Sequence, residues 1–505
     1  MNQRNRKIML ETHAWAGLIL GVLLFVICFS GSVAMFVGEL GAWTNPHLRR
    51  AYNPAPFSLE ARYQDARAAG LTQPNVFIAM PSPAQPYLSL ATFHNGEHQD
   101  IHIDPHTGEL LPTHHAEISE FLGHLHTDLH LPYPLGRYSI GLSGIFLLLL
   151  LVTGFLIHRK RWSELWLTRP TKTRRMWLTD IHKVLGTWGL PFTLVIAFTG
   201  AILGLLGFLG PFMALATYNG DVDAATQAFS GPPAQRTEQP APMMSLDTLR
   251  ERVLSDDPSM DIQYVSLREY GDGGAQIEFN GPARETLTYQ NAFVFSGADG
   301  ALLHRVNWNQ GGVWHQLFGM VTPLHFGSFG GPLLKWLYFL LGLSLTALCA
   351  TGTMIWLEKR LHQKHGAAPS TNRYARFAMG VCGGLPTATA VLFLTHALLA
   401  GDAPYVAFWL TWLGVVLLAW FGPTPAQLTL PLTAANAATA WLIPLVNGLA
   451  TGDFLWRSYR ELPYVFAVDA VFFLIGLTLW VVLQRRLWPS TRPAQARVLT
   501  PSRES

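Results

Sequence analysis

The sequence is short of charge, and this shortage limits the class of protein it can encode. Only 13% of its 505 residues are charged, about half the share expected of a soluble protein. Half of the residues are hydrophobic, and the mean hydropathy is +0.22. These values predict a polytopic membrane protein with sizeable soluble parts.

Cysteine and cofactor motifs are also scarce. The three cysteines lie in separate apolar runs without a CxxC spacing, so we infer no disulfide, zinc site or iron–sulfur cluster. No Rossmann glycine fingerprint or flavin motif occurs, so any electrons must come from a soluble cytoplasmic reductase or a membrane quinol. The net charge of +3, without a basic patch interleaved with aromatic residues, argues against nucleic acid as a partner.

Eight apolar runs with at most one charged residue each are long enough to cross a bilayer, which takes roughly 20 apolar residues. The basic residues Arg4, Arg6 and Lys7 precede the first run, so the positive-inside rule places the N-terminus in the cytoplasm. Eight spans return the C-terminus to the same side. The predicted spans cover residues 12–38, 136–157, 184–209, 333–357, 377–400, 404–421, 426–450 and 464–484.

Two soluble segments, 39–120 and 218–312, then lie outside the cell membrane. Both contain alternating runs that are typical of strands, such as YLSLATF in the first and AQIEFN in the second. The predicted fold class is therefore a polytopic α-helical membrane protein of about eight transmembrane helices with two external α+β segments.

The first four spans contain a duplication. ETHAWAGLILGVLLFVICFSGS resembles DIHKVLGTWGLPFTLVIAFTGA, each is followed by a soluble segment with a turn (DPHTGE, then SGADGA), and each half closes on a span containing Thr-Gly. Both halves have the same orientation, as in a parallel repeat. We divide the chain into a first repeat (1–170), a second repeat (171–365) and a C-terminal four-helix extension (366–505).

Histidines lie at both ends of these spans, where imidazole is expensive and most often functional. His13 and His182 occupy equivalent positions at the cytoplasmic ends of spans one and three. At the external ends, His325 is equivalent to His130 or to His126. An unbroken helix from His130 to the next cytoplasmic histidine, His158, would be roughly 42 Å long, so the histidines predict two sites, one near each membrane face.

Two imidazoles on facing helices, small neighbours and nearby positive charge are what a b-type haem requires. We therefore predict two haem b groups. The inner iron would be held by His13 and His182, with His158 competing, and the outer iron by His130 and His325, with His126 competing. The alternative for each histidine alone is a hydrogen-bonded interfacial residue.

Glycines near these histidines have two interpretations as well: clearance for a macrocycle, or close packing of helices. They are Gly17, Gly21, Gly186, Gly189, Gly327, Gly330 and Gly331. The first external segment is also rich in histidine, for which metal capture is one interpretation and a solvated polar face the favoured one.

Five motifs together resemble the PepSY-associated transmembrane family. They are H-x-W-x-G-L in span one, L-H-x-x-L-H before span two, T-G-x-x-x-H at its end, D-x-H-x-x-x-G opening span three and P-L-H-F-G-x-F-G-G before span four. The DPHTGE turn is similar to the strand–turn signature of the PepSY module. The resemblance covers about residues 1–365 and is nearest to the ferric-siderophore reductases, which include the ferrioxamine reductase.

This resemblance implies a haem-containing reductase in the bacterial inner membrane, which passes electrons to ferric siderophores in the periplasm and releases Fe(II). The family's motif histidines match His13, His126, His130, His158, His182 and His325. The four added spans depart from the family's four-span core, which leaves open a further role in quinone contact, assembly or transport. Two alternatives remain: a non-enzymatic PepSY-type envelope protein that binds a partner, and an iron or siderophore transporter.

Overall fold

The computed structural model describes most of the chain. The described residues are 3–94, 97–112, 118–157, 166, 168–169, 173–282, 287, 291–308, 313–361, 368–399 and 401–487. Eight of the helices in this part are long and apolar enough to cross a membrane, which confirms the expected number of spans. They are α1 (Gln3–Ala34), α5 (Leu135–Ile157), α7 (Leu190–Thr217), α12 (Gly331–Leu361), α13 (Pro369–His396), α14 (Ala403–Phe421), α15 (Pro425–Thr451) and α17 (Pro463–Leu487).

Shorter helices connect the spans or continue them. They are α2 (Val37–Thr44), α4 (Ile118–Thr127), α6 (Arg174–Trp188), α8 (Val222–Ser230), α10 (Val313–Gly319), α11 (Val321–Phe326) and α16 (Leu455–Glu461). Their boundaries follow local chemistry. Asp221 caps α8 by accepting the Ala224 N–H, and Thr173 caps α6 by accepting the Met176 N–H, as oxygen-bearing side chains commonly do for the unpaired donors of a first turn.

The two soluble segments join into a single antiparallel sheet, which the sequence did not predict. Its order is β4-β3-β2-β1-β5-β6-β7-β8, and the two halves meet where β1 pairs with β5, for example Phe77 opposite Ser266. The first half comprises β1 (Val76–Ala79), β2 (Leu88–His94), β3 (Glu97–Ile103) and β4 (Leu110–Leu111). The second comprises β5 (Tyr264–Arg268), β6 (Gln276–Gly281), β7 (Asn291–Ser296) and β8 (Leu302–Val306).

Each half of the sheet carries one helix before its strands, α3 (Leu59–Ala68) in the first and α9 (Leu246–Asp256) in the second. Alternate strand residues such as Val265 and Leu267 point to one side and pack with Tyr63 of α3 and Leu249 of α9 in one buried cluster. This period of two is the pattern expected of a sheet with one covered face. The predicted turns are present: Asp104 N–H donates to Glu109 O, and Ser296 N–H donates to Ala301 O.

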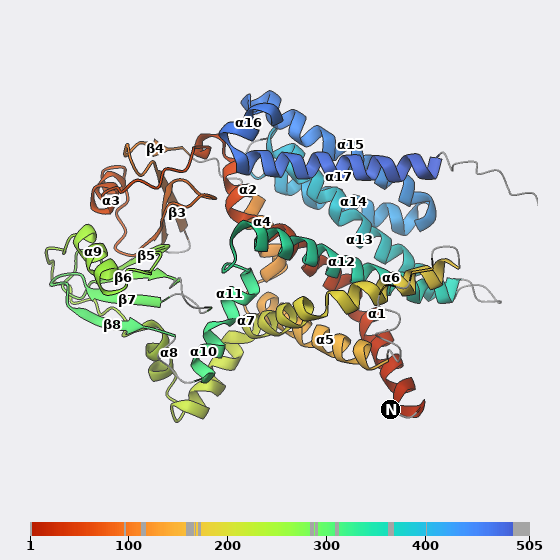
Figure 1. Ribbon diagram of the computed structural model, residues 1–505, viewed down its shortest axis with the longest axis horizontal. Helices are drawn as coiled ribbons and strands as arrows, with labels where there is room; N and C mark the ends of the chain where they lie inside the picture. Colours follow the sequence, from red (N-terminus) through yellow and green to blue (C-terminus); the bar gives the residue numbers. More distant parts are fainter. Residues whose placement is uncertain are drawn as a thin grey trace, which may run out of the picture.

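The sheet lies at one end of the helical body, and the helices of the extension, α13 to α17, lie along one flank of it (Figure 1). We call the end of the spans nearest the sheet the sheet side. Within the body α1 packs against α12, and α5 against α7, while α13 packs against α14 and α15. Apolar residues of α1, α2 and α4 share one buried cluster with residues of α13, α14, α15 and α17, so the extension is packed onto the first repeat.

A buried polar network adds to this packing. The Arg49 guanidinium donates to Asp453 (2.8 Å) and to Asn447 (2.9 Å). Asn447 in turn donates to Asp469 (2.9 Å), which also accepts from Trp43 Nε1 (2.8 Å). The side chain of Arg49 is only 2% exposed, and Asp469 is fully buried. Because buried charges are tolerated only when they are paired and hydrogen-bonded, this network indicates why a carboxylate is found in α17.

Candidate functional site

Two histidines from different repeats meet on the side of the spans away from the sheet. His13 lies on α1 and His182 on α6, and their ring centroids are 6.2 Å apart with the planes at 79°. The sequence predicted this pair from equivalent positions in the two halves. The structure brings the two rings together.

The protonation of His13 follows from its neighbours on α5. Its Nδ1 lies 3.0 Å from Leu150 O and 3.1 Å from Thr153 Oγ1. The Thr153 hydroxyl already gives its hydrogen to Leu149 O at 2.7 Å. Both atoms facing Nδ1 are therefore acceptors, so Nδ1 carries the proton and Nε2 carries the free lone pair.

His182 repeats this arrangement on α12. Its Nδ1 lies 3.1 Å from Leu348 O and 3.1 Å from Thr351 Oγ1, whose hydroxyl donates to Ala347 O at 2.8 Å. Nδ1 is again the donor and Nε2 the free nitrogen. We call His13 and His182 the inner pair.

A second pair lies on the sheet side. His126 at the end of α4 and His325 on α11 have ring centroids 6.2 Å apart, with the planes at 24°. His126 Nδ1 donates to Ile27 O at 2.9 Å. His325 Nδ1 donates to Thr199 Oγ1 at 2.9 Å, because that hydroxyl gives its hydrogen to Val195 O at 2.7 Å. We call His126 and His325 the outer pair.

Each of the four rings rests on a glycine of a neighbouring span. A Cβ added to Gly154 would lie 3.1 Å from His13 Cε1, and one added to Gly352 would lie 3.1 Å from His182 Cε1. In the outer pair a Cβ on Gly31 would lie 2.6 Å from His126 Cε1, and one on Gly200 would lie 3.1 Å from His325 Cε1. These glycines allow the rings to lie directly against a helix backbone.

They are not the glycines singled out from the sequence. Gly17 faces Leu150, Gly21 faces Thr353, and the left-handed Gly327 faces the Tyr338 ring. Even so, a sequence signal was available, since the four glycines belong to the small-Gly and Thr-Gly pairs that recur in the two repeats. In three of these pairs the residue directly before the glycine is a threonine that contacts a histidine ring: Thr153, Thr199 and Thr351.

The structure places His130 apart from the outer pair. It lies in a left-handed turn with Leu129 (φ of 54° and 57°), and α5 begins only at Leu135, so the helix is not continuous from His130. His130 Nε2 bonds Phe121 O at 3.0 Å, and its ring packs 5.6 Å from Trp409 on α14. His126, the competing ligand in the sequence prediction, is the residue beside His325. His158 lies outside the described residues.

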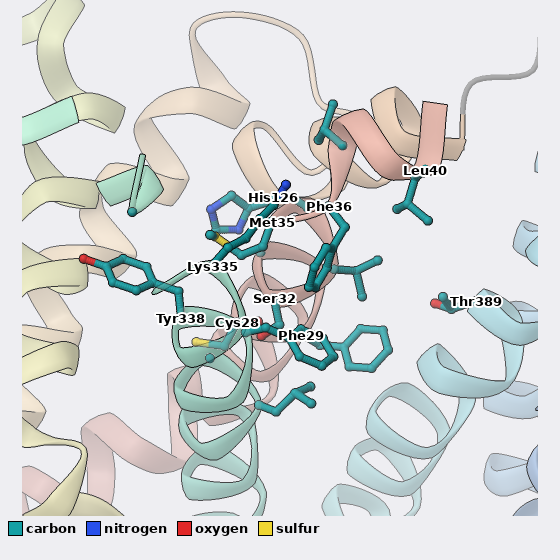
Figure 2. A pocket seen from close by; sticks show the side chains of 18 of the residues that line it. Cys28, Phe29, Ser32, Met35, Phe36, Leu40, His126, Lys335, Tyr338 and Thr389 are labelled. Atoms are coloured by element: carbon teal, nitrogen blue, oxygen red, sulfur yellow. Dashed lines mark hydrogen bonds between the residues drawn. The ribbon is translucent and has the colours of Figure 1, made fainter. Parts of the chain in front are cut away.

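The outer pair lines a large apolar cavity of about 1440 Å³. Figure 2 shows His126 at one side of this space, with Met35, which follows α1, and Lys335 of α12 near it. Arg137, at the start of α5, also lines the cavity and supplies positive charge near the outer pair. Lys335 is paired with Glu39, 2.6 Å from its Oε2.

Within the described part of the chain, no group of three or more His, Cys, Asp or Glu residues could hold a metal ion. Among the described residues, the histidines of these spans therefore offer a metal two imidazole pairs. Such a donor set suits a metal whose remaining ligands come from a macrocycle, because haem iron takes only axial ligands from the protein.

The model of the PepSY-associated TM region matches residues 10–359. The chain belongs to this PepSY-associated transmembrane family. All four paired histidines fall within the matched range, whereas α13 to α17 lie beyond it. An uncharacterized protein of Pseudomonas aeruginosa is 34% identical over 348 residues, which is 66% of this chain and 82% of that protein.

Proposed function

We propose that this PepSY-associated protein is a transmembrane electron-transfer reductase that holds one haem b at each histidine pair and reduces a ferric chelate on the sheet side. The observation that carries the proposal is that the two histidine pairs have the same arrangement. Each ring has its Nδ1 proton engaged by a backbone carbonyl or a threonine, and each pair has ring centroids 6.2 Å apart.

The spacing suits one metal atom between two rings. Two imidazole nitrogens, each roughly 2 Å from a central metal, place the ring centroids about 6 Å apart. Second-sphere hydrogen bonds from Nδ1–H to carbonyl or hydroxyl oxygens are the usual means of fixing the ligating tautomer. An ordinary packing role for these histidines would not require the same tautomer at four positions.

Haem bound at each pair would supply reversible one-electron chemistry between ferric and ferrous iron. The chain's own residues perform the supporting tasks. Thr153, Thr199 and Thr351 orient three of the rings, and Gly31 and Gly154 let two rings approach the helices. Arg137 provides a cation beside the outer cavity, where haem propionates require one.

The substrate side follows from the position of the outer pair. The basic residues Arg4, Arg6 and Lys7 lie in the first two turns of α1, so the sheet side is external by the positive-inside rule, as in an inner-membrane protein whose termini are cytoplasmic. A ferric siderophore reaching the outer pair would accept one electron. Ferrous iron binds oxygen-rich chelators weakly, so reduction releases it.

The proposal is tested with purified protein reduced anaerobically by dithionite and freed of excess reductant. Adding a ferric hydroxamate should reoxidise the haem bands and produce Fe(II), trapped by a ferrous chelator at one Fe(II) per electron stored. A gallium hydroxamate, which cannot be reduced, is the matched control. Protein that stays colourless after haem supplementation would contradict the reductase function and favour the partner-binding alternative. Protein that binds haem but does not react with the ferric hydroxamate would contradict the assignment of a ferric chelate as substrate.

A further inference from the structure

The cavity at the outer pair continues across α1 and α12 into a cleft against the C-terminal extension. On this far side its lining includes residues from α13, α15 and α17, among them Met379, Gly383, Thr389, Asn436 and Ala467. The family match ends at residue 359, so this wall is formed by the part of the chain that the family model does not include.

The wall is apolar except at a few atoms, and two of those atoms have no partner. Thr389 is 5% exposed, and its Oγ1 has no hydrogen bond to any described residue. Figure 2 shows this side chain on α13 facing α1 across the open space. The Oδ1 of Asn436 on α15 is likewise buried without a partner among the residues described.

Such atoms point to a ligand. A buried hydroxyl or amide left without a hydrogen bond destabilises the fold, and most membrane threonines avoid this by donating to the carbonyl four residues back. Thr395, six residues further along the same helix, does so with Val391 O at 2.7 Å. A lipid acyl chain could fill the cleft but could not bond Thr389 or Asn436.

Aromatic rings stand on both sides of the same cleft. Phe36 of the α1–α2 turn packs against Trp336 and Phe339 of α12, with ring centroids 4.7 Å and 5.2 Å away. Opposite them Phe393 of α13 packs against Phe472 of α17 at 4.8 Å. All five rings line the cavity. Aromatic walls favour a flat ring ligand, because offset stacking of aromatic rings is favourable beyond the area that it buries.

We infer that this cleft binds a membrane quinol, a flat ring with two hydroxyl groups and an isoprenoid tail. Its ring lies between the aromatic walls near Thr389, and its tail follows the apolar lining of α13, α15 and α17. The ligand supplies the hydrogen-bonding group that Thr389 lacks and occupies a space too large and too apolar for water alone.

The position of the cleft beside the outer pair suits a bound quinol to donate electrons. On the face of α1 toward the outer pair, Ile27 O accepts from His126 and Gly31 packs against that ring, while Phe29 and Val33 line the cavity with the cleft residues. The outer pair and the cleft therefore lie on opposite faces of one helix, which is about 10 Å in diameter. A quinol that gave up two electrons and two protons would become the quinone and would reduce two ferric ions by one electron each, its protons leaving to solvent on the sheet side. This donor role depends on the proposed function, whereas quinol binding does not.

Binding is tested directly with decylubiquinone and detergent-purified full-length protein, by quenching of tryptophan fluorescence. We expect saturable binding of one quinone per chain. Thr389→Val should weaken it about fivefold to tenfold, as loss of one neutral hydrogen bond predicts. Thr395→Val, which removes a hydroxyl bonded within its own helix, should leave affinity unchanged. Ala467→Phe, which adds a ring to the cleft lining, should abolish binding.

Several results would overturn the quinol site or the proposed function. Absence of saturable binding in folded wild-type protein, or equal affinity in wild type, Thr389→Val and Ala467→Phe, would overturn the quinol site. A co-purified phospholipid that decylubiquinone cannot displace would also overturn it. The double variant His13→Ala/His126→Ala separates the two proposals, since it should lose haem and keep quinone binding. Wild-type protein that contains haem but does not bind quinone would refute only the quinol site in the cleft. Wild-type protein that binds quinone but contains no haem would refute only the proposed reductase function.

Discussion

Thr153 accepts the Nδ1–H of His13 at 3.1 Å because its own hydroxyl hydrogen is committed to Leu149 O at 2.7 Å. The threonine thereby sets which imidazole nitrogen is free. Thr199 does the same for His325, but the two rings differ in support: His13 also bonds Leu150 O, whereas Thr199 provides the one Nδ1 contact of His325 among the described residues.

This difference predicts unequal effects of removing the two hydroxyls. Thr199→Val should lower haem affinity at the outer pair about tenfold to a hundredfold, the usual range for a lost second-sphere partner. Thr153→Val should cost less than tenfold at the inner pair. Haem transfer to a soluble scavenger protein measures both. Thr187→Val is the control, because among the described residues the Thr187 hydroxyl bonds only Lys183 O of its own helix. Equal losses in all three variants would contradict the role given to the threonines.

The close approach of Gly31 to His126 gives a second prediction. A methyl group on Gly31 would lie 2.6 Å from His126 Cε1, closer than carbon atoms approach, whereas one on Gly210 of α7 would meet no atom within 4 Å. Gly31→Ala should therefore displace the ring and reduce bound haem from two to about one per chain. Gly210→Ala should retain both. Haem content by pyridine haemochrome, normalised to protein, distinguishes them, and unchanged content in Gly31→Ala would show that the ring does not ligate there.

The Arg49 network predicts how firmly the extension is attached. Arg49→Met leaves Asp453 buried without its cation and removes the donor to Asn447, so we expect a loss of about 3–5 kcal/mol in unfolding free energy. Arg457→Met removes an exposed pair with Glu461 (54% and 59% exposed) and should change stability by less than about 1 kcal/mol. Denaturant titration in detergent compares them. Similar stability in both variants would mean that the network does not hold the extension.

The sheet should carry a pH dependence of its own. Burial lowers the pKa of His102 on β3 to about 4, and its Nδ1 has no partner among the described residues. The unfolded chain protonates this imidazole near pH 6.5, so between about pH 6.5 and 4 the unfolded state binds more protons and stability falls as the pH is lowered. The loss should total roughly 3 kcal/mol, at about 1.4 kcal/mol per pKa unit. His102→Gln should remove this part of the slope, measured by unfolding of the sheet at several pH values; identical slopes would contradict it.

The spans and the inner pair were open to prediction because they depend on local pattern. Apolar runs of about 20 residues with few charges identify spans, and the repeat places His13 and His182 at equivalent positions. The boundaries were less accurate: α1 begins at Gln3 and ends at Ala34, before a turn into α2, instead of covering 12–38. Polar residues such as Glu11 extend the helix beyond the uncharged run, which hydropathy alone does not detect.

Other features depend on contacts between distant segments. His126, and not His130, lies beside His325, because His130 is in a left-handed turn with Leu129 and packs against Trp409 of α14. The pairing of β1 with β5 joins strands nearly 190 residues apart. Thr389 is one of many apolar-run threonines in the sequence, and only the packing of α13 against α1 and α12 shows that its hydroxyl has no partner.

The most direct test is an optical spectrum of the purified protein, oxidised and dithionite-reduced, with haem counted per chain in wild type and in His13→Ala, His126→Ala and His130→Ala. We predict sharp reduced α-bands typical of bis-histidine b haem, with two haems in wild type, one in His13→Ala, one in His126→Ala and two in His130→Ala. Two haems retained in His126→Ala, or no haem in any of the four proteins, would contradict the account.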